Sequence, residues 1–265
     1  MPRSQTPPSP PEAPSPDPDI RDQGTADGDE IARFTAMAEE WWDSGGKFRP
    51  LHQINPCRIA FIRDRVAAHF DRDPLAEKPL EGLSLLDIGC GGGILSEPMR
   101  RLGALVTGID AGAENVRVAR LHAGQGGLDI EYRCQLPEDL ARQRASFDVV
   151  ANMEVIEHVT DRDAFFTACC DLVKPGGVMV SSTINRTLKS LALAKVGAEY
   201  VLRWLPIGTH DWKKFIRPSE LARGIRSHDM EVTELKGMAY SALRDQWRLS
   251  GDLDVNYLAF AVKGK

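Results

Sequence analysis

The sequence predicts an α/β fold built on a mostly parallel β-sheet, and two observations support this class. From residue 83 onward, short apolar runs alternate with segments of helical periodicity, and strands separated by helices form parallel sheets with right-handed crossovers. A glycine-rich turn follows the first run, and ligands bind at this carboxyl edge in such sheets. The expected strands cover residues 83–88, 104–109, 129–134, 147–152 and 178–184, with two later ones near 231–240 and 254–262.

Helices are expected before, between and after these strands. Apolar residues recur at helical spacing over 30–42, which predicts an amphipathic helix there. A second helix is expected over 56–70, because Asn55 is a good N-cap and Pro56 suits the first helical position. The remaining helices are expected from the glycine turn to residue 103 and over 114–123, 161–173 and 218–228.

The first 28 residues differ in composition from the rest of the chain. Eight of the first 18 residues are prolines, with Ser, Thr, Asp and Glu among them, and such a segment cannot bury apolar surface. We therefore expect a disordered tail over 1–28 and an ordered domain over 29–265. The tail has no apolar segment and is more acidic than basic, unlike a secretory or transit peptide, so a cytoplasmic location is expected.

The overall composition argues against two broad classes of protein. The formal net charge is -5 and the pI is about 5.7, which does not suit a protein that grips nucleic-acid phosphates. No run of 18 apolar residues occurs, so no membrane-spanning helix is expected. The five cysteines form no C-x-x-C pair, which is typical of reduced thiols.

The glycine turn carries the first chemical signal. Residues 87–93 read D-x-G-x-G-x-G, and position 94 is Ile where the dinucleotide fingerprint G-x-G-x-x-G needs glycine. This pattern favours a nucleoside that carries an amino acid over a pyrophosphate. Asp110 ends the second strand about 20 residues later, where an acidic side chain can accept ribose hydroxyls. An N-cap role for the helix near Ala113 is the alternative for Asp110.

Three stretches of the chain resemble class I S-adenosylmethionine-dependent methyltransferases: Leu86 to Gly93, Gly108 to Asp110, and Leu172 to Gly177. A closer resemblance covers nearly all of residues 30–265, and it is to the ubiquinone-biosynthesis O-methyltransferases. The stretches that carry it are 41–43, 50–58, 153–159, 182–186, 197–200, 208–211 and 254–257.

The resemblance implies a Rossmann-like sheet of seven strands, mostly parallel with one antiparallel edge strand, and helices on both faces. It also implies methyl transfer from S-adenosylmethionine to a ring hydroxyl of polyprenylated phenol and catechol intermediates, namely 2-polyprenyl-6-hydroxyphenol and 3-demethylubiquinol. Another class I methyltransferase with a different lipophilic acceptor is the alternative.

The resemblance further assigns donor-binding roles to four residues of this chain. Gly89 would line the donor through its backbone, and Asp110 would hold the ribose. Met153 would pack near the adenosine or methionine portion. Arg58 would reach the methionine carboxylate, which is sensible because guanidinium groups pair well with carboxylates.

Glu154, Glu157 and His158 follow the fourth strand and are the candidate catalytic residues. If a helical turn starts here, the three side chains share one face. They could hold a divalent cation that chelates a catechol, with Mg²⁺ preferred and Zn²⁺ permitted. Alternatively, His158 acts directly as the base that deprotonates the hydroxyl. A solvated acidic helix start is the structural alternative.

Residues 186–217 form an insertion between the fifth strand and the next helix. It has seven basic and two acidic residues, and 188–205 presents a wide apolar arc. We expect a lid over a lipophilic substrate, a helix at an anionic membrane surface, or both; an ordinary packed helix is the alternative. The expected location is then peripheral, on the inner face of the cytoplasmic membrane, with other ubiquinone-biosynthesis enzymes as candidate partners.

Three other functions fit parts of the pattern. A dehydrogenase would share the fold class, but Ile94 breaks its fingerprint. A nucleic-acid methyltransferase would need an Asn/Asp-Pro-Pro-aromatic motif where this chain has Asn-Met-Glu-Val at 152–155. A non-catalytic membrane scaffold would keep the insertion without binding a methyl donor, so titration with S-adenosylmethionine would distinguish it.

Overall fold

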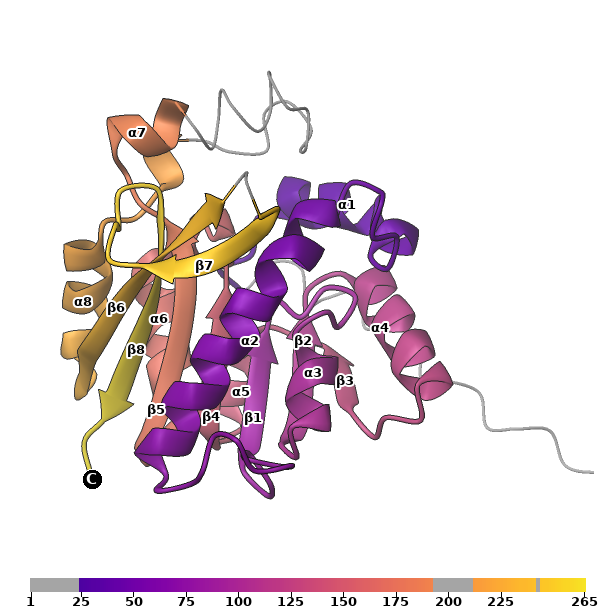
Figure 1. Cartoon of the computed structure of the whole chain (residues 1–265), viewed down its shortest axis with the longest axis horizontal. Coiled ribbons are helices and arrows are strands. Elements are labelled where there is room, and N and C mark those ends of the chain that lie inside the picture. Colours follow the sequence, from indigo (N-terminus) through magenta and orange to yellow (C-terminus); the bar gives the residue numbers. More distant parts are fainter. Residues whose placement is uncertain (1–23, 193–211, 242–243) are drawn as a thin grey trace, which may run out of the picture.

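A mixed β-sheet forms the centre of the molecule (Figure 1). The computed structural model describes residues 24–192, 212–241 and 244–265. The strands of this part are β1 (Ser84–Ile88), β2 (Leu105–Asp110), β3 (Glu131–Cys134), β4 (Phe147–Met153), β5 (Val173–Ile184), β6 (Met230–Ser241), β7 (Gln246–Ser250) and β8 (Asn256–Lys263). Their order across the sheet is β3-β2-β1-β4-β5-β8-β6-β7. The first five strands are parallel, as the strand–helix alternation predicts.

The far end of the sheet differs from the expectation of seven strands with one antiparallel strand at the edge. The described residues contain eight strands, and the antiparallel strand β8 lies between β5 and β6 rather than at the edge. An interior strand is covered on both faces, which explains why β8 is apolar and buried along most of its length. The additional edge strand β7 has mixed polar and apolar residues and no buried side chain, so it gives no apolar run in the sequence.

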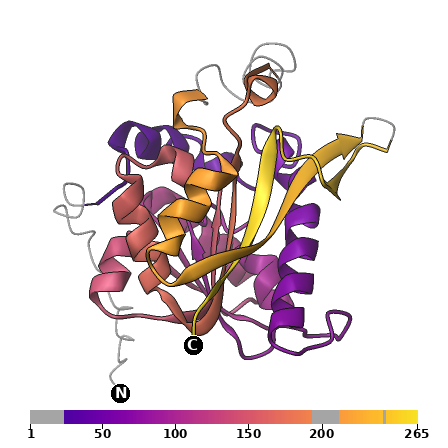
Figure 2. The same ribbon diagram turned by 90° about the vertical axis from the view of Figure 1, so that its left-hand side faces the viewer.

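Helices cover both faces of the sheet. Successive residues of a strand point to opposite faces, so Leu85 packs in a core cluster with α2 and α3 whereas Leu86 packs in one with α6 and α8. Figure 2 shows α2 on one side of the sheet and α6 and α8 on the other. The helices are α1 (Gly28–Thr35), α2 (Arg49–His69), α3 (Ser96–Arg101), α4 (Ala113–Gln125), α5 (Pro137–Arg142), α6 (Arg162–Asp171), α7 (Leu188–Ser190) and α8 (Pro218–Arg226).

Helix α2 begins seven residues earlier than expected. Its first turn contains Pro50, and Pro56 lies inside the helix rather than at its start. The Asn55 side chain is therefore not an N-cap; its Nδ2 donates to the carbonyl of Ile94, 2.8 Å away. Tertiary packing overrides the local signal here, because Phe61, Ile62 and Val66 on the same helix are buried in the core.

The segment before α2 also departs from the expected helix over 30–42. Helix α1 ends at Thr35, and a short 3₁₀ turn, Ala38–Glu40, follows it.

The ordered part of the chain also starts before residue 28. Thr25 is buried, and its carbonyl accepts from the backbone N–H of Thr160 at 2.7 Å. We call residues 24–48 the cap segment; Figure 1 shows α1 above the carboxyl ends of β1 and β2. The rest of the expected tail, 1–23, lies outside the described residues.

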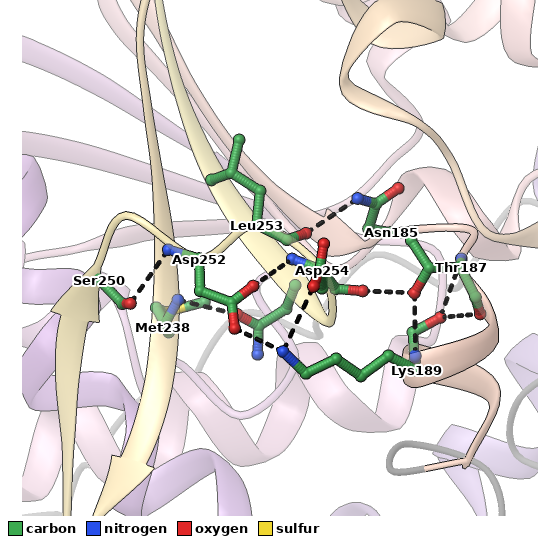
Figure 3. A network of polar contacts seen from close by, with 10 residues as sticks. Asn185, Thr187, Lys189, Met238, Ser250, Asp252, Leu253 and Asp254 are labelled. Atoms are coloured by element: carbon green, nitrogen blue, oxygen red, sulfur yellow. Dashed lines mark hydrogen bonds and ion pairs between the residues drawn. The ribbon is translucent and has the colours of Figure 1, made fainter.

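Most of the insertion expected at 186–217 lies outside the described residues, which resume at Trp212. Its first residues are tied to the loop before β8 (Figure 3): Lys189 pairs with Asp252 at 2.5 Å and with Asp254 at 3.3 Å, and Thr187 donates to the Asp254 carbonyl. The expected lid or interfacial helix over 188–205 is thus described only at its start. In the described parts of the chain, no helix combines the length and apolarity needed to cross a membrane.

Candidate active site

A cavity of about 260 Å³ lies at the carboxyl ends of β1, β2 and β4. One wall, which we call the strand-end wall, comes from the residues that follow these strands. It contains Gly89, Asp110, Met153, Glu154, Glu157 and His158. The opposite wall comes from the cap segment and contains Thr25, Ala26, Asp27, Glu30, Ile31, Phe34, Trp41 and Phe48. Arg58 of α2 also lines the cavity.

The glycine turn after β1 fits tightly between its neighbours. Gly89 has a φ of +68°, and a Cβ atom there would meet the side chain of Val155 at 2.5 Å. Gly91 has a φ of +52°, and its Cβ would meet the indole of Trp41 at 2.4 Å. Only glycine satisfies both the positive φ and the close approach without strain. The glycines therefore let the turn pass under the cap segment and border the cavity.

Asp110 lies at the end of β2, as expected, and borders the cavity. Its Oδ2 accepts from the Gly91 N–H at 2.9 Å, and its Oδ1 accepts from the Gly112 N–H at 2.8 Å and from Asn115 Nδ2 at 3.0 Å. Burial raises the pKa of Asp110, although these hydrogen bonds oppose the shift. A carboxylate has about four acceptor positions, so capacity remains for a ligand hydroxyl. The N-cap of α4 is Gly112 and no side chain caps this helix, so the N-cap alternative for Asp110 is wrong.

Asp87, which opens the glycine motif, is a buried carboxyl that the sequence did not single out for a role. Ser96 Oγ donates to its Oδ2 at 2.6 Å. Burial raises the pKa of Asp87 to about 7, and the neighbouring charge of Asp110 adds to that rise. This carboxyl is part of the cavity lining beneath the glycine turn.

Arg58 and Glu154 meet in the cavity from α2 and from the end of β4. Arg58 is 5% exposed, and its Nη2 pairs with Glu154 Oε1, which also accepts from Ser182 Oγ at 3.1 Å. The Nε of Arg58 is buried without a hydrogen-bond partner among the described residues. A buried, unpaired guanidinium N–H is costly, so this donor suits an anionic ligand. Met153, half-buried, packs beside this pair against the core.

His158 and Glu157 lie on the 3₁₀ turn Ile156–His158. Glu157 is buried, and its Oε2 accepts from Thr183 Oγ1 at 2.8 Å; burial raises its pKa. His158 Nδ1 lies 3.5 Å from Oε2 of Glu30, a residue of α1. Burial alone would lower the pKa of His158, but the contact with Glu30 and the charges of Glu157 and Glu30 raise it overall.

These three residues do not form a metal site as they are arranged here. Glu154 precedes the 3₁₀ turn and has a φ of +58°, so it does not share one helical face with the other two. Glu154 pairs with Arg58, Glu157 with Thr183, and His158 with Glu30. Among the residues that the structure describes, no three His, Cys, Asp or Glu side chains are grouped to hold a metal ion. The three side chains are therefore not gathered in this arrangement, and the metal site at Glu154, Glu157 and His158 stays a prediction.

The sequence reasoning missed the contribution of the cap segment to the site. Trp41 Nε1 donates to Asn115 Oδ1 at 2.9 Å, and the indole stacks on Phe48 with centroids 3.9 Å apart. Glu30 and Phe34, one helical turn apart on α1, both contact His158. The spacing of Glu30 and Phe34 places them on one face of the helix, but no pattern in the sequence indicates that this face meets His158.

Comparisons with known proteins agree with this geometry. The family described as "Methyltransferase domain" matches residues 86–181. Two curated relatives named "Ubiquinone biosynthesis O-methyltransferase" come from Paramagnetospirillum magneticum and Chelativorans sp.. The first is 58% identical over 91% of this chain and 96% of its own length, and the second is 56% identical over 90% and 94%.

Solved structures share the fold at low sequence identity. The plantazolicin methyltransferase BpumL in complex with SAH has a TM-score of 0.60 at 15% identity, covering 89% of this chain and 97% of that one. The magnesium protoporphyrin IX methyltransferase of Synechocystis with bound SAH has a TM-score of 0.55 at 20% identity, with coverage of 87% and 100%. These structures confirm the class I methyltransferase fold. The extent and identity of the curated matches show that the chain belongs to the family of ubiquinone biosynthesis O-methyltransferases.

Proposed function

We propose that this chain transfers the methyl group of S-adenosylmethionine to a ring hydroxyl of polyprenylated phenol and catechol intermediates of ubiquinone biosynthesis. The observation that carries this proposal is one cavity that brings together a buried guanidinium, a strand-end carboxylate and an imidazole: Arg58, Asp110 and His158. The first two suit the zwitterionic end and the ribose of the donor, and the third suits a base for the acceptor. The names of the curated relatives supply the acceptor class.

The donor-binding roles follow from the chemistry of the lining. The unpaired Nε of Arg58 is assigned to the methionine carboxylate, and the remaining acceptor capacity of Asp110 to the ribose. Gly89 has no side chain to block the donor at the glycine turn, and Met153 supplies an apolar contact beside the strand end. S-adenosylmethionine supplies the electrophilic methyl group when it is bound.

The proposed chemistry is an in-line displacement at that methyl carbon. The aryl oxygen forms a bond to the methyl carbon while the carbon–sulfur bond breaks and its electron pair stays on sulfur, leaving S-adenosylhomocysteine. A phenol has a pKa near 10, with tyrosine as the guide, so the hydroxyl must lose its proton before or during attack. His158 takes this proton, and the cavity aligns donor and acceptor.

Glu154, Glu157 and His158 pair with three different residues, so we assign deprotonation to His158 alone. A divalent cation held by the three side chains is the alternative to be tested. Exhaustive chelation tests the point directly. We expect the chelated enzyme to keep its turnover. Loss of turnover that Mg²⁺ or Zn²⁺ restores would show instead that the three side chains regroup around an ion.

The lipophilic acceptor also implies contact with a membrane, where other ubiquinone-biosynthesis enzymes would be neighbours, on the cytoplasmic face. Three basic residues of the insertion are paired within the chain: Arg186 with Glu220, Lys189 with Asp252 and Asp254, and Lys214 with Asp27. We therefore assign the contact chiefly to the apolar residues of 188–205 rather than to the basic residues.

Vesicle binding tests this assignment. The wild-type chain should co-sediment with phosphatidylglycerol-containing vesicles, and most of the binding should survive 0.5 M salt, where about a 4 Å Debye length screens surface charge. Trp204→Asp, in the insertion but outside the described residues, should weaken it. Binding lost in salt would return the role to the cations, and no binding by the wild type would contradict the membrane contact.

Complementation tests the proposed function as a whole. The chain is expressed in a bacterial strain that lacks its own ubiquinone O-methyltransferase, and quinone extracts are analysed by mass spectrometry. We expect the unmethylated phenol and catechol intermediates to disappear and ubiquinone to return. Persistent intermediates with a folded, expressed chain would contradict the proposal; His228→Ala, at a histidine outside the cavity, serves as the control variant.

A further inference from the structure

A buried amide connects the cap segment with the carboxylate that is assigned to the donor ribose. Asn115 lies in the first turn of α4, is 2% exposed and borders the cavity. Its Oδ1 accepts from Trp41 Nε1 at 2.9 Å, and its Nδ2 donates to Asp110 Oδ1 at 3.0 Å. An indole N–H can only donate and a carboxylate can only accept, so these two partners fix the orientation of the amide.

Asn115 completes the set of donors on one oxygen of Asp110. A carboxylate oxygen has about two acceptor positions. Oδ1 uses both, since it accepts from the Gly112 N–H at 2.8 Å as well as from Asn115. Among the contacts that the structure describes, Oδ2 accepts only from the Gly91 N–H, at 2.9 Å. The acceptor position that remains for a ligand is therefore on Oδ2, beside the glycine turn.

Trp41 of the cap segment contacts both groups that hold Asp110. Its Nε1 donates to Asn115, and its ring lies so close to Gly91 that a Cβ atom there would meet it at 2.4 Å. Asp110 is thus held through Asn115 at one oxygen and through the glycine turn at the other. Burial raises the pKa of Asp110, and the hydrogen bond from Asn115 opposes that rise, so the amide also favours the ionised carboxylate.

We propose that Asn115 is a positioning residue for the methyl donor: held by Trp41, it keeps the Asp110 carboxylate oriented towards the donor ribose. This inference rests on the proposed function, in which Asp110 accepts from the ribose. Docking of the cap segment and recognition of the ribose are then coupled, because one amide takes part in both. By linkage, the bound donor strengthens the docking of the cap segment as much as the docked cap segment strengthens donor binding.

A merely structural role, in which Asn115 only fastens the cap segment to α4, makes a different prediction. Asn115→Leu removes both hydrogen bonds and keeps a similar side-chain volume. Asn256→Leu is the matched control, because this buried amide at the start of β8 accepts from the Met238 N–H at 2.9 Å, away from the cavity lining. Trp41→Phe is the milder variant, since it removes only the hydrogen bond between the cap segment and Asn115.

The experiment uses the full chain and calorimetric titration with S-adenosylhomocysteine and its 2′-deoxy and 3′-deoxy analogues. For the wild type, we expect the loss of a hydroxyl to raise Kd by at least about tenfold with one or both analogues, as for a hydrogen bond to a charged group. In Asn115→Leu this factor should fall below about threefold, with an intermediate factor in Trp41→Phe. Adding Trp41→Phe to Asn115→Leu should change the factor no further. Asn256→Leu should keep the wild-type factor, whatever its melting temperature.

Two titration results would overturn the inference. One is an Asn115→Leu variant that binds all three ligands more weakly by the same factor, which would indicate the structural role. The other is a wild type with equal affinity for all three ligands. If Asn115→Leu does not fold, Trp41→Phe tests the same point, and a wild-type factor in Trp41→Phe would then overturn the inference.

Hydrogen-exchange mass spectrometry tests the coupling separately. S-adenosylhomocysteine should slow amide exchange in the cap segment of the wild type, and it should do so less in Trp41→Phe. Equal slowing in both proteins would contradict the coupling. Neither readout depends on turnover, so a wild type that distinguishes the three ligands but methylates no catechol contradicts only the proposed function.

Discussion

The two walls of the cavity are built in different ways. The strand-end wall consists of residues that directly follow β1, β2 and β4, so the parallel sheet itself brings Gly89, Asp110 and His158 to one edge. The wall of the cap segment comes from a short helix and a 3₁₀ turn that reach the site only by docking on it. The same cavity therefore combines a wall specified by local motifs with a wall specified by tertiary contacts.

Because the two walls are built differently, we expect them to have different roles in the reaction. The strand-end wall holds the group assigned to proton transfer and the groups assigned to the donor, apart from Arg58 of α2. The cap segment covers the glycine turn with Trp41 and turns Glu30 towards His158. Variants in the first wall should change chemistry or donor binding strongly, whereas variants in the second should act more weakly and through the residues that they cover.

The largest effect is expected from His158→Ala in the strand-end wall. Removing the proposed base should lower kcat by about 10²- to 10⁴-fold. The affinity for S-adenosylmethionine should change little, since Arg58 and Asp110 remain. Steady-state kinetics and calorimetric titration check both, with His228→Ala as the control. A variant that keeps more than a tenth of the wild-type kcat would remove His158 from the mechanism.

Next in size is Asp110→Ala in the same wall. It removes an acceptor for the ribose and three internal hydrogen bonds. Calorimetric titration should show donor binding weaker by about 1.5–3 kcal/mol, the range for a hydrogen bond to a charged group. Asp129→Ala, at an exposed carboxylate before β3, is the control. Wild-type donor affinity in a folded Asp110→Ala protein would rule out the ribose role.

A smaller effect is expected from Trp41→Phe in the cap segment. This change removes the hydrogen bond to Asn115 and keeps an aromatic ring above Gly91. The free energy of unfolding and donor binding should each weaken by about 0.5–1.5 kcal/mol, with kcat at saturating donor unchanged. Trp247→Phe in β7 is the comparison, because that indole N–H has no partner among the described residues. Equal losses in both variants would mean that the cap contact is not specific.

The smallest expected effect is the pH dependence of the contact between the walls. The pKa of His158 is raised in the folded chain, so protonation of His158 stabilises the fold fully below its unfolded pKa of about 6.5. That stabilisation is lost as the pH rises through the folded pKa. The difference in melting temperature between wild type and His158→Gln should therefore shrink from pH 6 to pH 9. A difference that is constant or grows with pH would contradict the Glu30–His158 contact.

The sequence predicted the strand-end wall better than the cap segment, for a physical reason. A residue such as Asp110 or Met153 ends a buried strand, and the parallel sheet leaves few positions for it. Glu30 reaches the site through the docking of α1, which depends on Thr25, Lys214 and other residues far apart in the sequence. The same limit explains why α2 does not start at Pro56. The local signal for a helix start there was overridden by the packing of α2 on the core.

The strands show the same limit at the far end of the sheet. Apolar runs located β1 to β4, β6 and β8 within a few residues, whereas β5 begins at Val173, before the expected start at 178. They could not show that β8 lies between β5 and β6. An apolar run indicates that a strand is buried, but it does not indicate which strands lie beside it. The strand β7 was missed because its residues are mostly exposed.

The fate of an isotopically labelled methyl group tests O-methylation most directly. The purified full chain is incubated with ¹³C-methyl-labelled S-adenosylmethionine and a short-prenyl catechol, and the product is examined by NMR and mass spectrometry. We predict one labelled methyl on a ring oxygen for each S-adenosylhomocysteine formed, with transfer nearly abolished in His158→Ala. Label on a ring carbon, or no transfer to a catechol by a chain that binds the donor, would contradict the account.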